Sequence, residues 1–406
     1  MSFIYGRPDC YGRRIYAGKS YVGTKNVVVL PEIEGHVAVD FYNEQGVKTH
    51  SLTSDMKESP LLKLEFENNE NGCAGFTLEL ARGHGIDITL GQRIDIRLLG
   101  GTAPWYSGYV QTMPMRALDT EKAQTYAGYG CFARLGHIIV NKLYEETEIA
   151  KIAEDVIQRY VEGNGATYNG SKLYFTGYTA TKVNFAHATA KDALQQLSEF
   201  AVNYVWGVDE YREVFFKPRR DEVNDYMRLW VGEHVESVET EEDIESVENE
   251  IHVEGNIETT DEEGNITTTK GILAVCRDNA SIRRYGLRAA VKTLPSALKA
   301  EDARQWGESE LAQSKDPGRS VSLGGIHPDI IRRRITPDGL ASITSEDGAD
   351  AEVFPISSVK YICSKSGISM EIVLGEYKAG FEQSILKMKR DIINAELLSR
   401  AGETGG

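Results

Sequence analysis

The sequence has little positive charge for its length. Its 45 lysine and arginine residues stand against 61 aspartate and glutamate residues, which gives the 406-residue chain a formal net charge of -16. A surface that binds duplex nucleic acid or an anionic membrane needs clustered basic side chains, so neither is expected as a general partner. No apolar run approaches the ~20 residues of a transmembrane helix. Residues 1–14 lack the apolar core of a signal peptide, so we expect neither stable membrane insertion nor export by the general secretory route.

Cysteine is also scarce. The five cysteines are scattered along the chain, and no two of them form a CxxC pair. Their odd number and irregular spacing predict reduced thiols in a protein assembled in the cytosol, rather than a disulfide framework. The five are Cys10, Cys73, Cys131, Cys276 and Cys363.

The short motifs that are typical of catalysis are missing as well. The sequence contains no GxSxG elbow, no HExxH zinc motif, no Walker loop and no EF-hand loop. Its eight histidines are dispersed and match no zinc spacing, and the glycine-rich run Gly128–Gly136 fits a strand turn better than a dinucleotide loop. We therefore expect no catalytic residue, no cofactor and no metal, although a site assembled from distant positions would be recognised only by its geometry.

Short β-strands dominate what is present. Residues 36–110 contain six short apolar runs separated by glycine-rich turns, a pattern typical of a sandwich or barrel. Within them, Ile94, Ile96 and Leu98 alternate with Asp95 and Arg97, which predicts a strand that is buried on one side. Residues 222–375 return to strand patterns after a helical segment.

Thr189–Pro218 is the most clearly patterned unit in the middle of the chain. Its apolar residues first follow helical spacing, with Thr189 as the N-cap and Asp192 three residues later, and then change to the pattern of a hairpin that Pro218 ends. Two further helices are predicted, one over Thr147–Gly163, capped by Thr147, and one over Lys299–Ser314.

The strongest electrostatic feature is Glu236–Glu263, which holds thirteen acidic residues and no lysine or arginine. The simplest interpretation is a solvated acidic hairpin with Asp261–Asn265 as its turn. Two basic clusters stand elsewhere, one formed by Arg283, Arg284 and Arg288 and the other by Arg332–Arg334. Neither has the interleaved aromatic residues of a single-strand platform, so we interpret both as contacts with acidic protein neighbours.

Three stretches, taken in order, carry a resemblance to a known family. Ile86–Met113 (IDITLGQRIDIRLLGGTAPWYSGYVQTM) precedes Thr189–Pro218, with its DALQQL helix and FFKP strand, and Ser281–Gly325 contains SIRRYGLR and EDARQWGESELA. Together they resemble the tail or baseplate hub proteins of tailed bacteriophages and related contractile injection machines, the late-control-protein-D-like or Mu-type hub family.

The resemblance implies an α+β fold that is predominantly β. It implies two tail-tube-like β-barrels joined by a small α/β module, with a C-terminal helix. The expected domains are a first barrel with an N-terminal arm over 1–139, the α/β module over 140–221, a second barrel over 222–375, and a C-terminal helix with a frayed tail over 376–406.

The function that the resemblance implies is structural and not enzymatic. Such a homotrimeric hub adapts a sixfold tail tube to a threefold spike or fibre, nucleates the tube and lets DNA pass, without a cofactor. The implied partners are other copies of the chain, a tail tube or distal tail protein, a spike or fibre protein and a tape-measure protein, with DNA only in passage. The implied location is the virion tail, at the baseplate or tail tip, after assembly in the host cytoplasm.

Two sets of residues are candidates for this role. Acidic residues that face a central channel would repel DNA phosphates and keep a duplex from adhering to the wall. A short heptad seam near the C-terminus would contact a spike or a neighbouring subunit, or would pack on its own domain. The acidic candidates are Glu241, Glu242, Asp243, Glu245, Asp261, Glu262 and Glu263, and the seam residues are Phe381, Ile385, Met388 and Ile392.

Two alternatives belong to other functional classes. The chain would be a hydrolase of cell-wall or surface polymer if its fold assembled a cleft with paired carboxylates. It would be a glycan-binding or receptor-binding module if aromatic side chains such as Trp105, Tyr106 and Tyr109 lay on the surface, although Trp105 falls within the first barrel and is expected to pack there.

Overall fold

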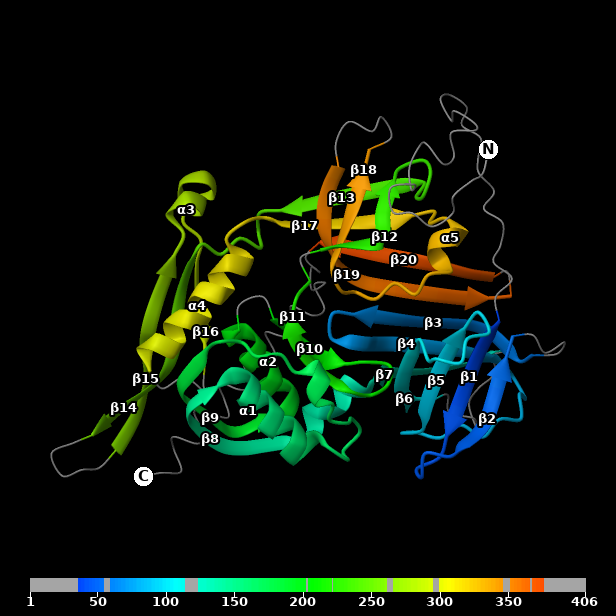
Figure 1. The fold of residues 1–406 in the computed structure, drawn as a ribbon, viewed down its shortest axis with the longest axis horizontal. Coiled ribbons are helices and arrows are strands. Elements are labelled where there is room, and N and C mark those ends of the chain that lie inside the picture. Colours follow the sequence, from blue (N-terminus) through cyan, green and yellow to red (C-terminus); the bar gives the residue numbers. More distant parts are fainter. Residues whose placement is uncertain are drawn as a thin grey trace.

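The computed structural model of the chain is predominantly β, with five α-helices among the residues that it describes (Figure 1). This agrees with the expected fold class. The N-terminal arm and the seam helix lie outside the described residues. The structure describes residues 36–54, 59–113, 123–201, 204–220, 222–260, 266–294, 299–345, 351–365 and 367–375.

One large sheet of 15 strands runs through most of the molecule. Its main path begins at strand β13 and ends at β2, and it takes strands from both ends of the chain (Figure 1). In order along the path, the strands are β13 (Ser237–Asp243), β17 (Gly318–Gly324), β20 (Gly367–Gly375), β19 (Ala351–Ser364), β3 (Leu61–Asn69), β4 (Gly72–Ala81), β7 (Ala123–Gly130), β6 (Tyr106–Thr112), β5 (Arg93–Leu98), β1 (Val37–Tyr42) and β2 (Lys48–Thr53). Branching from it are β10 (Tyr204–Val208), β11 (Val214–Pro218), β12 (Val223–Trp230) and β18 (Leu340–Thr344).

The expected pair of barrels is not seen as two separately closed barrels among the described strands. Strand β3 pairs with β4 on one side and with β19 on the other, so the early and late strands share one hydrogen-bonded path. A single hydrophobic core contains buried side chains from both the early and the late strands of this path. Phe66 of β3 stacks on Tyr361 of β19 at 5.1 Å, and the ring of Trp105 meets Tyr361 edge-on at 5.3 Å. The aromatic contacts therefore join the two halves directly.

The middle of the chain forms a smaller α/β layer. The predicted cap of the second helix is confirmed, because the Thr189 hydroxyl accepts a hydrogen bond of 3.0 Å from the amide of Asp192. The predicted cap of the first helix is wrong, because Glu148 rather than Thr147 accepts from the amide of Lys151. The layer consists of β8 (Ile139–Glu148), α1 (Ile149–Val156) with a π-helical turn (Ile157–Val161), β9 (Thr179–Thr189) and α2 (Ala190–Phe200), followed by the predicted hairpin β10–β11.

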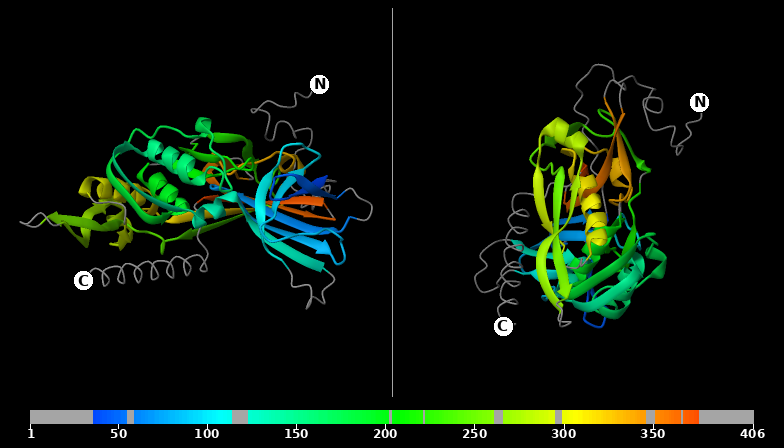
Figure 2. Two further views of the ribbon diagram at one scale, coloured as in Figure 1. Left: turned by 90° about the horizontal axis from the view of Figure 1, so that it is seen from below. Right: turned by 90° about the vertical axis from the view of Figure 1, so that its left-hand side faces the viewer.

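A separate three-stranded sheet packs beside this layer. Helix α4 covers one face of the sheet, and its Trp306 shares a core with α1 and α2 (Figure 1). Figure 2 shows this group at one end of the molecule and β1–β7 at the other. The bounds of the expected domains stay a prediction. The sheet contains β15 (Ile266–Arg277), β14 (Glu250–Thr260) and β16 (Ala289–Thr293), and the helices α3 (Asn279–Tyr285), α4 (Ala300–Ser314) and α5 (Pro328–Ile331) complete the fold.

Candidate functional site: the outward face of the large sheet

The outward face of the large sheet carries polar side chains at every second position. On β3, Leu64 and Phe66 are buried in the core, whereas Glu65 and Glu67 point outward between them. Because directly paired residues of an antiparallel sheet share a face, the register extends this outward row across the neighbouring strands. Glu67 pairs with Lys360 of β19, which in turn pairs with Glu371 of β20. The outward face therefore continues across the junction between the early and late strands.

The register also settles which way the acidic residues of β13 point. Glu239 and Glu241 pair with Ser322 and Ser320 of β17. The pairing of β17 with β20 puts these positions on the outward face. Glu242 lies on the opposite face of β13, and its carboxylate forms an ion pair of 2.5 Å with Arg319. The candidate Glu241 therefore joins the outward face, and the candidate Glu242 does not.

The remaining acidic candidates are divided. Asp243 has outward parity at the end of β13, and its carboxylate accepts a hydrogen bond of 2.8 Å from the amide of Glu245 in the following turn. The hairpin predicted around Asp261–Asn265 is confirmed, because β14 and β15 pair antiparallel up to Thr260 and Ile266. The acidic stretch as a whole is not one hairpin, because β13 pairs with β17. The candidates Asp261, Glu262 and Glu263 lie outside the described residues. The seam candidates Phe381, Ile385, Met388 and Ile392 also lie outside them.

Sequence reasoning missed four acidic residues of this face, namely Glu65, Glu67, Glu239 and Glu371. The sequence of β3 (LLKLEFENN) contains a signal for Glu65 and Glu67, since charged and apolar residues alternate from Lys63 to Glu67. Nothing local indicated that β3 and β20 would share a face with β13, because strand pairing between distant segments sets that relationship.

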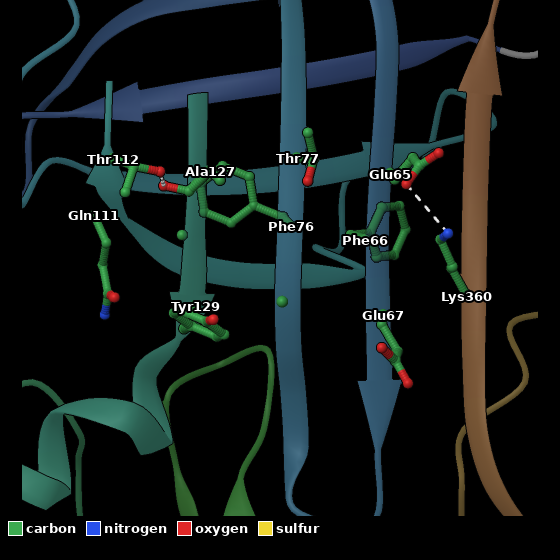
Figure 3. Close-up of a pocket in the computed structure, with 12 residues that line it drawn as sticks. Glu65, Phe66, Glu67, Phe76, Thr77, Gln111, Thr112, Ala127, Tyr129 and Lys360 are labelled. Carbon is green, nitrogen blue, oxygen red and sulfur yellow. Dashed lines mark hydrogen bonds and ion pairs between the residues drawn. The ribbon is translucent and has the colours of Figure 1, made fainter. Parts of the chain in front are cut away.

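A hollow of about 310 Å³ lies on this face where β3, β4, β6, β7 and β19 meet (Figure 3). Gly75 has no side chain, which leaves space beside the ring of Tyr129, and this ring is 53% exposed. Lys360 forms ion pairs of 3.2 Å with Glu65 and 3.8 Å with Glu371 across the rim. The hollow is lined by Glu65, Phe66, Glu67, Gly75, Phe76, Thr77, Gln111, Thr112, Ala127, Gly128, Tyr129 and Lys360.

The charges around the hollow do not suit acid catalysis. The Lys63 ammonium lies 2.5 Å from Glu65, and together with Lys360 it holds the pKa of the Glu65 carboxyl below its usual value. A general acid for glycoside hydrolysis needs the opposite shift, because it must keep its proton near neutral pH. Glu65 therefore serves as an ionised wall residue, and the hydrolase alternative gains no support here.

The aromatic residues proposed for glycan binding do not form an exposed platform. Trp105 and Tyr106 are buried, which confirms the expected packing role of Trp105. The Tyr106 hydroxyl donates a hydrogen bond of 2.7 Å to the carbonyl of Ala74. Tyr109 is covered by the guanidinium of Arg134, which lies 3.2 Å from its ring centre.

The structure also bears on metal binding, on membrane-spanning helices, on the cysteines and on the second basic cluster. In the part of the chain that the structure describes, no group of three or more His, Cys, Asp or Glu residues could hold a metal ion, and no helix is long and apolar enough to cross a membrane. Four cysteines, Cys73, Cys131, Cys276 and Cys363, are buried free thiols. In the Arg332–Arg334 cluster, Arg334 forms an ion pair of 2.5 Å with Glu210, so part of this cluster is used within the chain.

Solved structures with a similar fold come from phage tails. The 43 kDa tail protein of prophage MuSo2 from Shewanella oneidensis superposes with a TM-score of 0.58 at 15% identity, over 84% of this chain and 98% of that one. The fold is that of phage tail proteins. A tail protein from Neisseria meningitidis MC58 gives a TM-score of 0.56 at 10% identity, over 84% of this chain and 96% of that one. The prophage tail protein gp18 from Listeria monocytogenes EGD-e gives 0.53 at 11% identity, over 87% and 98%.

No protein-family model and no curated protein sequence matches the chain. At identities between 10% and 15%, the similarity to these tail proteins concerns the fold. It covers 96% to 98% of the length of each of the three structures.

Proposed function

We propose that the chain is a structural protein of a phage-type tail. Three copies would form a hub at the baseplate or tail tip, which joins a sixfold tail tube to a threefold spike or fibre. The hub would nucleate the tube and let DNA pass through its centre, with no catalytic step. The observation that carries this proposal is the fold similarity to tail proteins over 84% of the chain and 98% of the first of them.

A ring of three chains can match a sixfold tube if each chain contributes two similar groups of strands. The early strands β1–β7 and the late strands β17–β20 form one continuous path, joined at β3 and β19. If each half offers one tube-like unit to a ring, three chains provide six such units, which is the number that a sixfold tube requires. The ring would retain threefold symmetry at its other end, where a spike or fibre would bind.

The outward face of the large sheet is the surface that we assign to the channel. It presents five glutamates along one continuous surface. Lys63 and Lys360 lie among them and neutralise part of the charge, but the surface stays acidic. The glutamates are Glu239 and Glu241 of β13, Glu371 of β20, and Glu65 and Glu67 of β3. These carboxylates carry the same charge as DNA phosphates and repel them. The repulsion is strongest where the wall surrounds the duplex and where salt screens the charges little. Such a wall would guide DNA without retaining it.

The proposed partners follow from this assembly. They are other copies of the chain, a tail tube or distal tail protein, a spike or fibre protein and a tape-measure protein. The proposed place of action is the virion tail, after assembly in the host cytoplasm. Asp261, Glu262 and Glu263 stay candidates for the channel, and the seam of Phe381, Ile385, Met388 and Ile392 stays a candidate for the trimer or spike contact.

The test is the native mass of the full chain over a concentration series, with image averages of the same sample. One chain has a mass of 45.1 kDa, so a trimer is expected at about 135 kDa. The expected image is a threefold ring with an open centre that binds the tail tube protein encoded by the same particle. A dimer or a tetramer, or a closed centre, would contradict the hub. So would a monomer that also fails to bind the tube protein.

A further inference from the structure

Helix α3 and the turn after it form an exposed basic and apolar projection at the outer end of the small sheet (Figure 1). We call Arg283, Arg284, Leu287 and Arg288 the basic knob. Leu287 is 62% exposed, and Arg283 and Arg284 are exposed beside it. Arg284 lies 5.0 Å from the ring of Tyr285. Among the described residues, the guanidinium groups of Arg283 and Arg288 form no ion pair, so their charges are available to a partner.

The basic knob is held in a fixed shape. The Asp278 carboxylate caps α3 by accepting hydrogen bonds of 2.9 and 2.8 Å from the amides of Ala280 and Ser281. The buried Asn249 side chain donates to the carbonyl of Gly286 at 2.8 Å and accepts from the amide of Arg288 at 2.8 Å. An ordered projection loses little conformational entropy when it docks, so this geometry favours a specific contact.

A surface of opposite charge lies on the segment that leads to Asn249. We call Glu241, Ile244 and Glu245 the acidic edge, because they lie near the end of β13 and in the turn that follows it, and β13 is an edge strand of the large sheet. Ile244 is 43% exposed, and both glutamates are exposed. The Glu245 side chain forms no ion pair with any described residue. The acidic edge thus matches the basic knob in composition, with one aliphatic side chain flanked by charges.

We propose that the basic knob of one copy docks on the acidic edge of a second copy. Leu287 would contact Ile244, and the arginines would face Glu241 and Glu245. Exposed ion pairs contribute little energy each, about 0.2–1 kcal/mol, but they select the orientation and the partner. The aliphatic contact supplies the apolar burial that the charges lack.

The open face of the small sheet can enlarge this contact. Val291 of β16 is 66% exposed, and Val275 and Ile272 of β15 are half exposed on the face opposite to α4. A stable interface buries about 800 Å² on each partner, which is more than one leucine and three arginines provide. These aliphatic side chains also favour a protein partner over duplex DNA, which a basic surface would otherwise suit.

The proposed contact joins two different surfaces, so repeating it generates a closed ring or an open filament. Closure at three copies rests on the proposed function, whereas the contact itself rests on the matched surfaces. The acidic edge would then have two roles, since Glu241 lies both on the outward face and within reach of the neighbouring knob.

Charge reversal on the full chain tests the contact. Sedimentation over a concentration series measures association for R283E/R284E, for E241K/E245K and for the combined fourfold variant. Each double variant should weaken association at least about tenfold, and the fourfold variant should restore most of it, because the ion pairs re-form with their signs exchanged. R82E/R228E, which reverses two exposed arginines outside both basic clusters, is the matched control and should associate like the wild type. Circular dichroism checks that every variant is folded.

Several outcomes would overturn this contact while leaving the hub proposal to its own test. The wild type would be monomeric at every concentration, or both double variants would form the wild-type oligomer. Alternatively, both double variants would dissociate and the fourfold variant would remain dissociated. If R283E/R284E instead abolished binding to a 30-base-pair duplex and left the oligomer unchanged, the knob would be a nucleic-acid contact. A threefold ring that persists in all variants would support the hub with a different interface.

Discussion

The indole nitrogen of Trp306 donates a hydrogen bond of 2.9 Å to the carboxylate of Glu199. This bond joins α4 to α2, two helices that are distant in sequence. The other Glu199 oxygen accepts at 2.9 Å from the side chain of Gln195, which itself accepts at 2.8 Å from the indole of Trp206. Two tryptophans on different elements are thus connected through α2, in the core that the small sheet shares with the α/β layer.

Substitution of Glu199 should alter how stability depends on pH. Burial, followed by repulsion from Glu310 of α4, raises the pKa of Glu199 above 4.5, while Lys292 of β16 acts in the opposite direction. The folded chain therefore binds this proton more tightly than the unfolded chain does. The contribution of Glu199 to stability is fully present below the unfolded pKa of about 4.5 and is lost as the pH rises through the raised pKa.

The test is urea unfolding of the wild type and of Glu199→Gln at several values between about pH 5 and about pH 8. Glutamine retains an acceptor for Trp306 but does not titrate. Its stability relative to the wild type should therefore increase steadily toward the alkaline end. A constant difference across the series would show that Glu199 titrates alike in both states and would contradict the argument. Trp306→Phe, which removes the donor together with part of a buried ring, should destabilise the chain by at least about 1–3 kcal/mol at neutral pH.

Asp302 is expected to be the most sensitive residue of α4. It is fully buried, and its carboxylate accepts hydrogen bonds from the Tyr178 hydroxyl at 2.9 Å and from the amides of Thr181 and Lys182 at 3.1 and 3.2 Å. Asp302→Ala leaves three donors without an acceptor, so the free energy of unfolding should fall by about 3–5 kcal/mol. Chemical denaturation measures this loss. Glu301→Ala, at the exposed neighbouring position, should change it by less than about 0.5 kcal/mol, and equal effects of the two substitutions would refute the assignment.

Local signals in the sequence predicted the local structure well. Helix α2 was found from the spacing of its apolar residues and from Thr189, because a helix and its cap are determined by residues close in sequence. The alternation of Ile94, Ile96 and Leu98 likewise predicted their burial, since a strand with one buried face repeats every two residues.

The pairing of strands that are distant in sequence could not be predicted from such local signals. Nothing in Leu61–Asn69 indicates that β3 would join β19, and this pairing decides that the two halves share one sheet and one core. The acidic stretch shows both cases, because the turn signal at Asp261–Asn265 correctly predicted the β14–β15 hairpin, whereas nothing local indicated that β13 would pair with β17. The outward face could therefore be predicted strand by strand, but its continuity required the register between strands.

Gly72 should be essential where the first strands meet the α/β layer. It has a φ of +97°, and a Cβ there would overlap the carbonyl oxygen of Val208 in β10. Hydrogen bonds hold the same junction, since the Asn71 side chain donates at 2.7 Å to the carbonyl of Trp206. Gly72→Ala should therefore destabilise the chain by more than backbone strain alone, by at least about 2 kcal/mol.

Gly46 provides the matched control for this steric effect. Its φ is +75°, but no atom lies within 4 Å of the position that a Cβ would take. Gly46→Ala should cost only the strain of a left-handed backbone, about 1 kcal/mol. Thermal unfolding of the two variants compares these costs, and a cost for Gly72→Ala that does not exceed that of Gly46→Ala would mean that β10 moves away without penalty.

Reversal of the charge on the outward face should convert a surface that repels DNA into one that retains it. Glu67→Lys, Glu239→Lys and Glu371→Lys together change the net charge of one chain by six units, from -16 to -10, with every change on the proposed wall. The assembled variant should bind a linear duplex at low salt and release it as salt rises, because phosphate contacts exchange with counterions. The wild type should not bind under the same conditions.

The matched control for this reversal moves the same charge to other exposed positions. Glu145→Lys, Glu146→Lys and Glu301→Lys place three lysines on β8 and α4, away from the outward face. If net charge alone governed retention, both triple variants would bind DNA equally, as measured by gel shift over a salt series. Retention confined to the outward-face variant would instead mean that a duplex reaches this face in the assembly. Equal retention, or none in either variant, would remove the reason for assigning this face to the channel.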